Sequence, residues 1–197
     1  MRYPSEHKRQ THDRIVRAAS RRFRRRGREG AGIGDLMRDL RLTHGGFYRH
    51  FASKDELFVE AFEQALGEAR ERFHKALARA TPGKELKALI DSYLDLEHCD
   101  DIEDGCPVAA LTTEIPRESR ESRERMVQAL RHHVTEIQRY VPGADDQERR
   151  RNTVALLSGM AGALTVARAF SSVEDRRRIL EGAKAFYLRA LMPKAEG

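Results

Sequence analysis

The stretch that decides the fold of this chain is Thr43-His44-Gly45-Gly46-Phe47-Tyr48-Arg49-His50-Phe51, followed directly by Ser53-Lys54-Asp55-Glu56-Leu57. This pattern predicts a short helix over 43–51 and a second, long helix that begins almost at once. Thr43 is a good N-cap residue for the short helix, and Ser53 with Glu56 three positions later has the spacing of a capping box. We therefore expect the short helix to be fixed at both ends.

The short helix has two different faces. Phe47 and Phe51 are four positions apart, so they are expected to point together into a core. His44 and Tyr48 are also four positions apart and lie together on the opposite side of the helix. Arg49 lies next to them, as does Gly45, which has no side chain. A face with polar groups, a cation and missing side chains can approach a nucleic-acid groove closely. His50 is as well suited to brace the domain as to contact DNA.

The composition predicts an all-α protein of ordinary globular type. The 197 residues are 35% charged and 40% hydrophobic, and no stretch alternates polar and apolar residues as a strand would. No segment has the length and apolarity of a signal peptide or a membrane span, so we expect a cytoplasmic protein with no membrane contact. Two cysteines, Cys99 and Cys106, are too few for a disulfide framework.

The charge is distributed unevenly. The first 51 residues contain 14 Lys/Arg and 5 Asp/Glu, whereas the remaining 146 contain 23 and 26. A basic segment beside an acidic remainder is the electrostatic pattern expected of a nucleic-acid-binding head, because cations neutralise phosphates. A solvated basic helix without a partner is the alternative explanation.

A helix is predicted before the opening stretch over 11–26, with Ile15, Ala19 and Phe23 on one face and Gly27 as its stop. Another is predicted over 33–40. Two helices joined by a short turn, the second with a polar outer face, follow the helix-turn-helix plan. The whole segment of about 11–60 resembles the N-terminal DNA-binding domain of the tetracycline-repressor (TetR) family of regulators, and the run from Phe47 to Leu57 is the most specific part of this resemblance.

The resemblance implies a DNA-binding site on double-stranded, palindromic operator DNA. The positions of Thr43, Tyr48 and Lys54 typically contact phosphates in this family. With the outer face of the short helix, the predicted DNA-binding set is Thr43, His44, Gly45, Gly46, Tyr48, Arg49 and Lys54. The chain departs from the family pattern at Arg41, where a turn glycine is usual, at Met37 and Leu40, where alanine is preferred, and at Gly32, where a threonine is common.

The rest of the chain is predicted to form a helical bundle, which makes about nine helices in total. Residues 8–54 would be the helix-turn-helix domain, continuing into the long helix to about 80, and 55–197 a domain for ligand binding and dimerisation. Beyond the head, the predicted helices are 54–80, 85–99, 107–114, 119–141, 145–170 and 172–191.

Small residues suggest how two copies could associate. Gly159, Gly162 and Ala163 let another helix approach closely, and Ile179 and Phe186 are available on the last helix. We expect a homodimer that presents two recognition helices to two half-sites. A contact between helices inside one subunit would explain the same small residues.

A small-molecule inducer is expected to bind in the bundle. Tyr93, Cys106, Met126, His133 and Met160 lie on different predicted helices or helix starts and could line its site, although core packing explains each of them equally well. His132 and His133 are adjacent, so one of them is expected to face the bundle. Cys106 at a predicted helix start could also be a thiol that senses electrophiles or oxidants, which is the alternative function.

Other classes of function are disfavoured. The cluster from His98 to Cys106 lacks the ligand spacing of a zinc site, so neither a metal nor another cofactor is expected. No nucleophile elbow, phosphate-binding loop or His-Glu-x-x-His helix is present, which argues against an enzyme. A helical scaffold that does not bind DNA is the remaining alternative. The resemblance thus implies a ligand-responsive transcriptional regulator, most often a repressor, and the sequence leaves repressor and activator both open.

Overall fold

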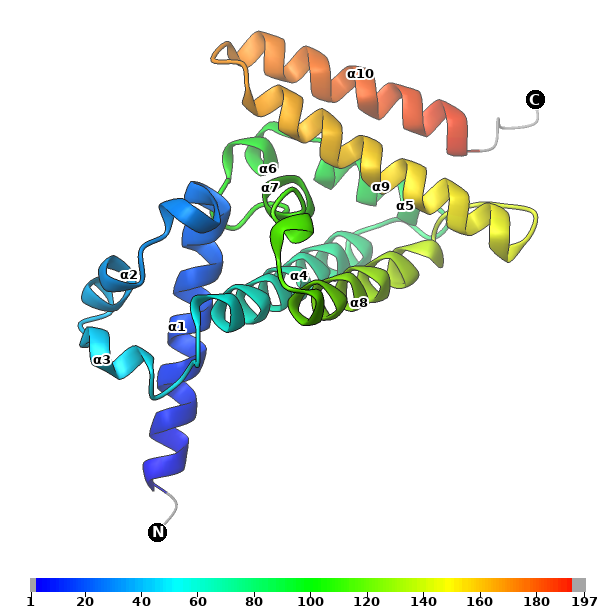
Figure 1. The fold of residues 1–197 in the computed structure, drawn as a ribbon. Helices are drawn as coiled ribbons and strands as arrows, with labels where there is room; N and C mark the ends of the chain where they lie inside the picture. The colour runs from blue at the N-terminus through cyan, green and yellow to red at the C-terminus, as the bar shows by residue number, and fades with distance from the viewer. Residues whose placement is uncertain (1–2, 193–197) are drawn as a thin grey trace, which may run out of the picture. The chain divides into compact units, whose positions relative to one another are not determined.

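The structure is a computed structural model that describes residues 3–192, and this part of the chain contains helices and no strand. The described residues form ten α-helices and one short 3-10 helix, and the labels in Figure 1 mark the α-helices. The elements in order are α1 Tyr3–Gly30, α2 Ile33–Asp39, α3 His44–Phe47, α4 Lys54–Ala78, α5 Glu85–Tyr93, α6 Leu96–Asp100, α7 Pro107–Leu111, η1 Ile115–Arg117, α8 Arg120–Gln138, α9 Asp146–Arg168 and α10 Val173–Leu191. The all-α prediction is confirmed.

The chain divides into two compact units. The first unit consists of the residues up to Glu68 together with Ile102–Ala129, and the second consists of Ala69–Asp101 and the residues from Leu130 onward. The long helices α4 and α8 each contribute to both units. None of the described helices combines the length and the apolarity that a bilayer span requires.

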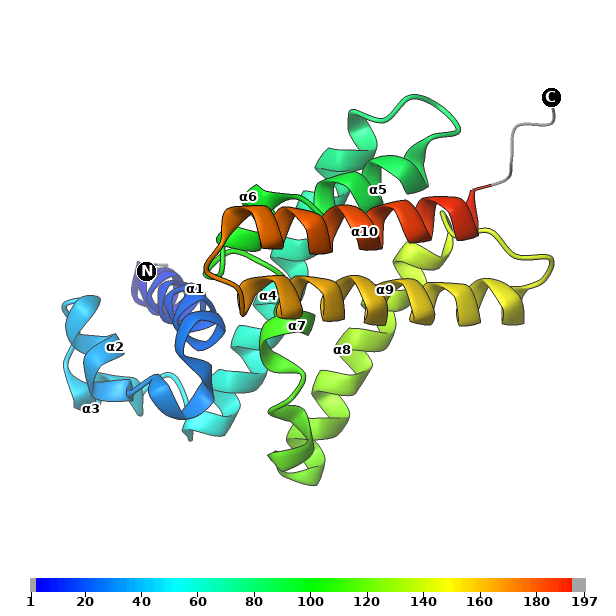
Figure 2. The same cartoon turned by 90° about the horizontal axis from the view of Figure 1, so that it is seen from above.

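The first unit is organised around five buried phenylalanines. Phe23 of α1 meets Phe58 of α4 edge to face at 5.0 Å between ring centroids, and Phe47 lies 5.4 Å from Phe51. Phe62 completes the set, and all five side chains are almost fully buried. Aromatic side chains remove large apolar areas from water, so this cluster supplies much of the stability of a small unit. Figure 2 shows α2 and α3 as neighbours beside α1.

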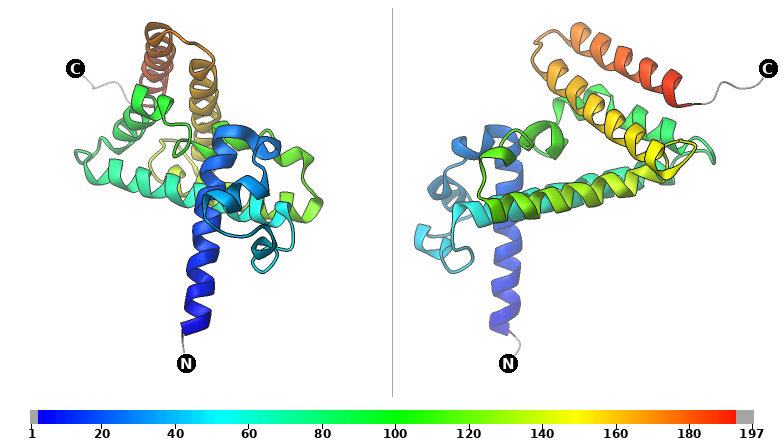
Figure 3. Two further views of the ribbon diagram at one scale, coloured as in Figure 1. Left: turned by 90° about the vertical axis from the view of Figure 1, so that its left-hand side faces the viewer. Right: turned by 45° about the vertical axis from the view of Figure 1, so that its right-hand side comes forward.

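The second unit is built from the end of α4, helices α5 and α6, the end of α8, and the pair α9–α10. Helices α9 and α10 lie side by side, as Figures 1 and 3 show from different directions. The core side chains of α9 recur at helical spacing and are Thr153, Leu156, Leu157, Met160, Ala161, Leu164 and Ala167. Asp145 and Ser172 cap the two helices by accepting hydrogen bonds from the Glu148 and Asp175 backbone N–H groups.

Helix boundaries differ from the sequence prediction in three places. The first helix begins at Tyr3 rather than at residue 11, and helical structure resumes after a single left-handed residue, Gly27 (φ 68°). The recognition helix is four residues long, because the chain tightens into turns after Phe47. The region 107–114 ends its helix at Leu111 and continues through the 3-10 helix that contains Pro116.

The predicted helix 85–99 is also wrong, because it is interrupted at Leu94 and Asp95. The Asp95 carboxylate accepts a hydrogen bond from the His98 backbone N–H at 2.7 Å, and the His98 imidazole Nδ1 contacts the Tyr93 carbonyl oxygen at 2.7 Å. These two bonds satisfy backbone groups that a continuous helix would have paired, so Asp95 ends one helix and caps the next. This interruption raises the predicted nine helices to ten.

Candidate functional site

The recognition helix α3 has a side-chain cap at its N-terminus, and the following helix α4 has one at its own N-terminus. The Thr43 hydroxyl accepts a hydrogen bond from the Gly46 N–H at 3.2 Å, and the Ser53 hydroxyl accepts one from the Glu56 N–H at 3.1 Å. The Glu56 carboxylate accepts a further bond from the Ala52 N–H at 2.5 Å. The predicted caps are therefore present. The Glu56 carboxylate accepts its bond from the Ala52 N–H, whereas in a standard capping box the donor would be the Ser53 N–H.

The inner face of this segment packs against α1 as well as against the phenylalanine cluster. The His12 imidazole stacks on the Phe51 ring at 4.5 Å and lies 6.0 Å from the His50 ring. The His12 Nε2 atom contacts the Glu60 carboxylate of α4 at 2.7 Å. Burial, followed by the charges of His12, Lys8 and Arg49, lowers the pKa of His50. His50 thus braces the turn against α1.

The outer face presents few side chains. Tyr48 is 62% exposed and its ring lies edge-on to His44, with 5.9 Å between centroids. A side chain added to Gly45 would meet no atom within 4 Å, so this position is open to an approaching partner. Gly46 is different, because a Cβ atom there would lie 3.2 Å from the Thr43 hydroxyl and 3.8 Å from Met37 Cε. Gly46 therefore makes room for the cap inside the unit.

Cations with and without internal partners occupy different parts of the first unit. Arg49 and Arg41 are exposed and Lys54 is half-buried, and none of the three forms an ion pair with any residue that the structure describes. By contrast, Arg21 contacts Asp104 at 2.7 Å and Arg25 contacts Glu103 at 2.6 Å. The basic face of α1 is thus partly neutralised by the acidic segment before α7, which the sequence did not reveal.

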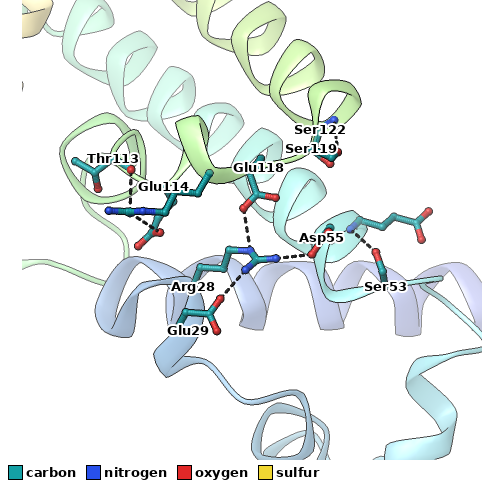
Figure 4. Close-up of polar contacts among 11 residues, drawn as sticks. Arg28, Glu29, Ser53, Asp55, Thr113, Glu114, Glu118, Ser119 and Ser122 are labelled. Carbon is teal, nitrogen blue, oxygen red and sulfur yellow. Dashed lines mark hydrogen bonds and ion pairs between the residues drawn. The ribbon is translucent and has the colours of Figure 1, made fainter.

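Arg24 and Arg28 are internal ion-pair residues. The Arg24 side chain is 0% exposed and contacts the Glu68 carboxylate at 2.7 Å. Figure 4 shows Arg28, just after Gly27, in contact with Glu118 and Asp55. The Glu118 side chain is only 2% exposed, and burial raises its pKa while the Arg28 charge opposes that shift. These arginines hold the first unit together and are not available to DNA.

The turn between α2 and α3 contains Arg41 in a left-handed conformation, with φ 59°. Among the residues that the structure describes, it is the one non-glycine residue with a positive φ. The Arg41 and Leu42 N–H groups donate to the carbonyl oxygens of Arg38 and Met37 at 2.9 and 2.8 Å, which closes the turn. The turn therefore keeps the geometry that suits glycine, at a cost in backbone strain on the order of 1 kcal/mol.

The predicted effector residues belong to different units. Cys106 and Met126 lie in the first unit, where Met126 is part of the phenylalanine-containing core and Cys106 is the N-cap residue of α7. Tyr93, His133 and Met160 lie in the second unit. Both cysteines are buried thiols, with Cys106 at 6% exposure, and burial raises the pKa of Cys99. Among the described residues there is no group of three or more side chains suited to a metal ion.

The predicted dimerisation residues differ in exposure. A Cβ atom on Gly159 would lie 1.5 Å from the Tyr187 hydroxyl, so this glycine accommodates α10 of the same chain. Gly162 faces open space, and Phe186 is 52% exposed. Ala163 and Ile179 are half-buried. The small residues of α9 therefore face two directions, Gly159 toward α10 and Gly162 toward solvent.

The short capped helix α3 has an exposed polar face and follows α2 across a tight turn. This arrangement is the helix-turn-helix motif of DNA-binding proteins. The family model for the N-terminal part, described as "Bacterial regulatory proteins, tetR family", matches residues 15–61, and that described as "Tetracyclin repressor-like, C-terminal domain" matches residues 82–183. The chain belongs to the TetR family of transcriptional regulators, whose members bind DNA and small ligands and act as dimers.

Relatives agree with this assignment. The chain is 31% identical over 90 residues to the uncharacterised regulator YfiR of Bacillus subtilis, which covers 46% of this chain and 42% of YfiR. It is 31% identical over 120 residues to the uncharacterised regulator Rv0196 of Mycobacterium tuberculosis, covering 60% and 59% of the two chains. The matches thus span about half the length of these curated relatives. A TetR regulator of Chloroflexus aurantiacus has a similar structure, with a TM-score of 0.70, 26% identity and coverage of 94% and 98%.

Replacing Arg41 with glycine is expected to raise the free energy of unfolding by up to about 1 kcal/mol, because glycine adopts a positive φ without strain. Replacing Arg41 with valine should lower it, since a β-branched residue is poorly suited to this conformation. Urea unfolding of the three proteins measures both effects. An Arg41→Gly protein less stable than the wild type would show that the arginine side chain contributes more than its backbone costs.

A second prediction concerns His133, whose pKa is lowered to about 4 by burial and, next, by the charge of Arg70. An unfolded histidine titrates near 6.5, so between these values the unfolded chain binds more protons. The contribution of neutral His133 to stability is present above about pH 6.5 and is lost as the pH falls toward 4. Between pH 7.5 and 5 this loss amounts to about 2 kcal/mol.

Urea unfolding at pH 7.5 and 5 tests this expectation in the wild type and in His133→Gln. The variant should lose about 2 kcal/mol less stability on acidification than the wild type. His132→Gln is the matched control, because its exposed side chain precedes His133 on the same helix. Identical pH dependence in wild type and His133→Gln would contradict the prediction.

Proposed function

We propose that this protein is a homodimeric repressor that binds a palindromic operator in double-stranded DNA and releases it when a small-molecule inducer binds the C-terminal bundle. The observation that carries the DNA-binding part is the outer face of α3, where Tyr48 is exposed, Gly45 is open and Arg49 forms no ion pair with any residue that the structure describes. Such a protein acts by binding rather than by catalysis, in the cytoplasm, where its DNA lies.

Within this proposal the predicted DNA-binding residues have separate tasks. His44 and Tyr48 contact base edges or the adjacent backbone, and Gly45 lets the DNA approach. Arg49 and Lys54 contact phosphates and fix the orientation of the helix on the duplex. Thr43 and Gly46 form the cap, so their contribution to binding is mainly the position of α3.

The dimer proposal is supported by the exposed surface of α9. From Asn152 to Ala167 the helix carries no charged residue, although six of its side chains or glycine positions are exposed to solvent. These are Val154, Ala155, Ser158, Gly162, Thr165 and Val166. An uncharged face of small and apolar residues on an otherwise highly charged chain is suited to a second copy of itself, and Phe186 of α10 extends it.

A change in effector occupancy would alter the distance between the two recognition helices. The duplex accepts a dimer only when its two helices match half-sites separated by whole turns of DNA. An inducer that binds the mismatched conformation more tightly than the matched one shifts the population toward release. A small molecule that bound the matched conformation more tightly would instead act as a co-repressor. Measuring operator affinity with and without the small molecule distinguishes an inducer from a co-repressor.

DNA binding is tested by gel shift on genomic fragments selected by the protein itself. Tyr48→Ala and His44→Ala should weaken binding by about 5- to 150-fold, with altered preference among sites if base edges are contacted. Arg49→Ala should weaken binding to all sites similarly and should reduce the salt dependence by about one phosphate contact. Arg38→Ala, on the exposed surface of α2 with its charge paired to Asp35, is the control. Unchanged affinity in all three test variants would contradict the proposed interface.

Dimerisation is tested by sedimentation of Val166→Glu. A carboxylate in the middle of an uncharged face would be repeated on both sides of a two-fold interface, so the variant should sediment as a monomer at micromolar concentration. Ile102→Glu places the same charge on an exposed aliphatic residue of the first unit and should remain dimeric. A wild-type protein that is monomeric with and without operator DNA would exclude the proposed dimer.

A further inference from the structure

The Arg28 guanidinium contacts three carboxylates through three different nitrogen atoms. Its Nε atom lies 2.9 Å from Glu118 Oε1, its Nη1 atom lies 2.5 Å from Glu29 Oε1, and its Nη2 atom contacts Asp55 (Figure 4). The guanidinium also lies over the Phe58 ring, 5.9 Å from the ring centroid. Because its N–H groups point in fixed directions, a guanidinium can bridge separate partners, which the single ammonium group of a lysine cannot reproduce.

Two of these carboxylates belong to the beginnings of long helices. Asp55 lies in the first turn of α4, and Glu118 is the C-cap residue of η1, two positions before α8 begins. Helices α4 and α8 both continue from the first unit into the second, whereas Arg28, Asp55 and Glu118 all lie in the first unit. One residue of α1 therefore holds the first-unit ends of both helices. We call the two ion pairs, Arg28 with Asp55 and Arg28 with Glu118, the Arg28 bridge.

The Glu118 carboxylate depends on Arg28. The Glu118 side chain is 2% exposed, and its second oxygen, Oε2, is buried and has no hydrogen-bond partner among the residues that the structure describes. Within the same part of the chain, the carboxylate forms an ion pair with Arg28 alone. Loss of the guanidinium would leave a buried charge without compensation, which is strongly unfavourable. Glu118 therefore favours the arrangement in which the start of α8 and the end of α1 are in contact.

The backbone directly before Arg28 is adapted to this contact. Gly27 has φ 68° and ψ 174°, a conformation that is essentially restricted to glycine, and it interrupts α1 at this point. Only three more helical residues follow, because α1 ends at Gly30. An interruption so close to the end contributes little to α1 itself, whereas it sets the direction in which Arg28 leaves the helix.

The elements on the two sides of the Arg28 bridge have further contacts of their own. On one side, His12 of α1 stacks on Phe51 at 4.5 Å, which attaches the segment after α3 to α1. On the other side, Arg125 of α8 contacts Glu63 of α4 at 3.0 Å, which joins these two helices without α1. The bridge thus connects α1, which supports the proposed DNA-binding surface, to the pair α4 and α8.

We propose that Arg28 is a positioning residue, which fixes the direction of α1–α3 relative to the first-unit parts of α4 and α8 and thereby sets the half-site spacing that the dimer accepts. This inference rests on the proposed function and adds the contact through which a shift of α4 or α8 would reach the recognition helix. The aromatic core also joins α1 to α4, but apolar contacts are not directional. Charge-assisted contacts from a planar guanidinium add geometric specificity, so the bridge selects one arrangement.

The preference of the full-length protein between two operators measures this role. One probe is the operator that the wild type selects. The other has one base pair inserted at its centre, which moves the half-sites about 3.4 Å apart and rotates them by about 35°. Gel shift gives the affinity for each probe. A variant that is merely less stable loses affinity for both probes alike, so the ratio of the two affinities reports the direction of the recognition helices and not the stability.

Two substitutions break the bridge in different ways. Arg28→Lys keeps the charge but cannot reach both Asp55 and Glu118, and Glu118→Gln replaces the buried carboxylate by a neutral group of the same shape. We expect the wild type to prefer the selected operator by about tenfold, and each variant to lower that preference by roughly threefold or more. Arg22→Lys is the matched control, because Arg22 of α1 has one carboxylate partner, Asp39, which a lysine can keep. Wild-type preference in either test variant, or an equal loss in the control, would overturn the proposal.

Hydrogen exchange of the DNA-free protein tests the bridge without relying on operator binding. Arg28→Lys should speed amide exchange in the first two turns of α4 and α8 by about tenfold and leave α9 unchanged. Wild-type exchange rates in these turns would overturn the proposal. A wild type that binds both operators equally would overturn it as well, while leaving DNA binding intact. A wild type that binds neither operator would instead contradict the proposed function itself.

Discussion

The burial of Phe47 and Phe51 is the constraint on which the proposed DNA-binding surface depends. A helix of four residues cannot hold its own shape, because nucleation costs more than one turn of hydrogen bonds returns, and Gly45 and Gly46 add to that cost. The position of α3 is therefore set by two aromatic rings in a core shared with α1 and α4, by its own N-cap at Thr43 and by the cap at the start of α4. The glycines that weaken the helix are tolerated because tertiary packing, and not propensity, holds it in place.

The arginines of α1 show why the net charge of a segment overstates the positive charge that its surface presents to a partner. Arg21, Arg24 and Arg25 share a helix with exposed cations, yet each contacts a carboxylate from a distant part of the chain. Pairing a buried arginine such as Arg24 is necessary, since an unpaired buried charge would cost several kcal/mol. The described cations of the head without such partners include those in the N-terminal half of α1 and around α3. Under the proposed function, long-range phosphate attraction would therefore arise from a smaller part of the head than its composition suggests.

Features with local causes were predictable from the sequence, and features with distant causes were not. The caps at Thr43 and Ser53 depend on residues three positions away, and both predicted caps are present. The interruption at Asp95 was missed because the apolar spacing continues across it, while the deciding bonds involve the His98 side chain and the Tyr93 carbonyl. The candidate effector residues have in common that they lie on different predicted helices or helix starts. The sequence does not show that Cys106 and Met126 belong to one unit and Tyr93, His133 and Met160 to the other, because the boundary between units passes through α4 and α8.

The two glycines of α9 show how a short motif can carry two contacts. Residues three apart on a helix point about 60° from each other, so both cannot face the same neighbour equally. The position of Gly159 is taken by Tyr187, and without that glycine α9 and α10 could not pack as closely as they do. Gly162 has no such neighbour within the described chain, and the exposed residues around it carry no charge. Packing inside the subunit explains Gly159 but not Gly162. The small-residue pattern therefore still supports the proposed contact with a second copy of the chain after the contact with α10 is accounted for.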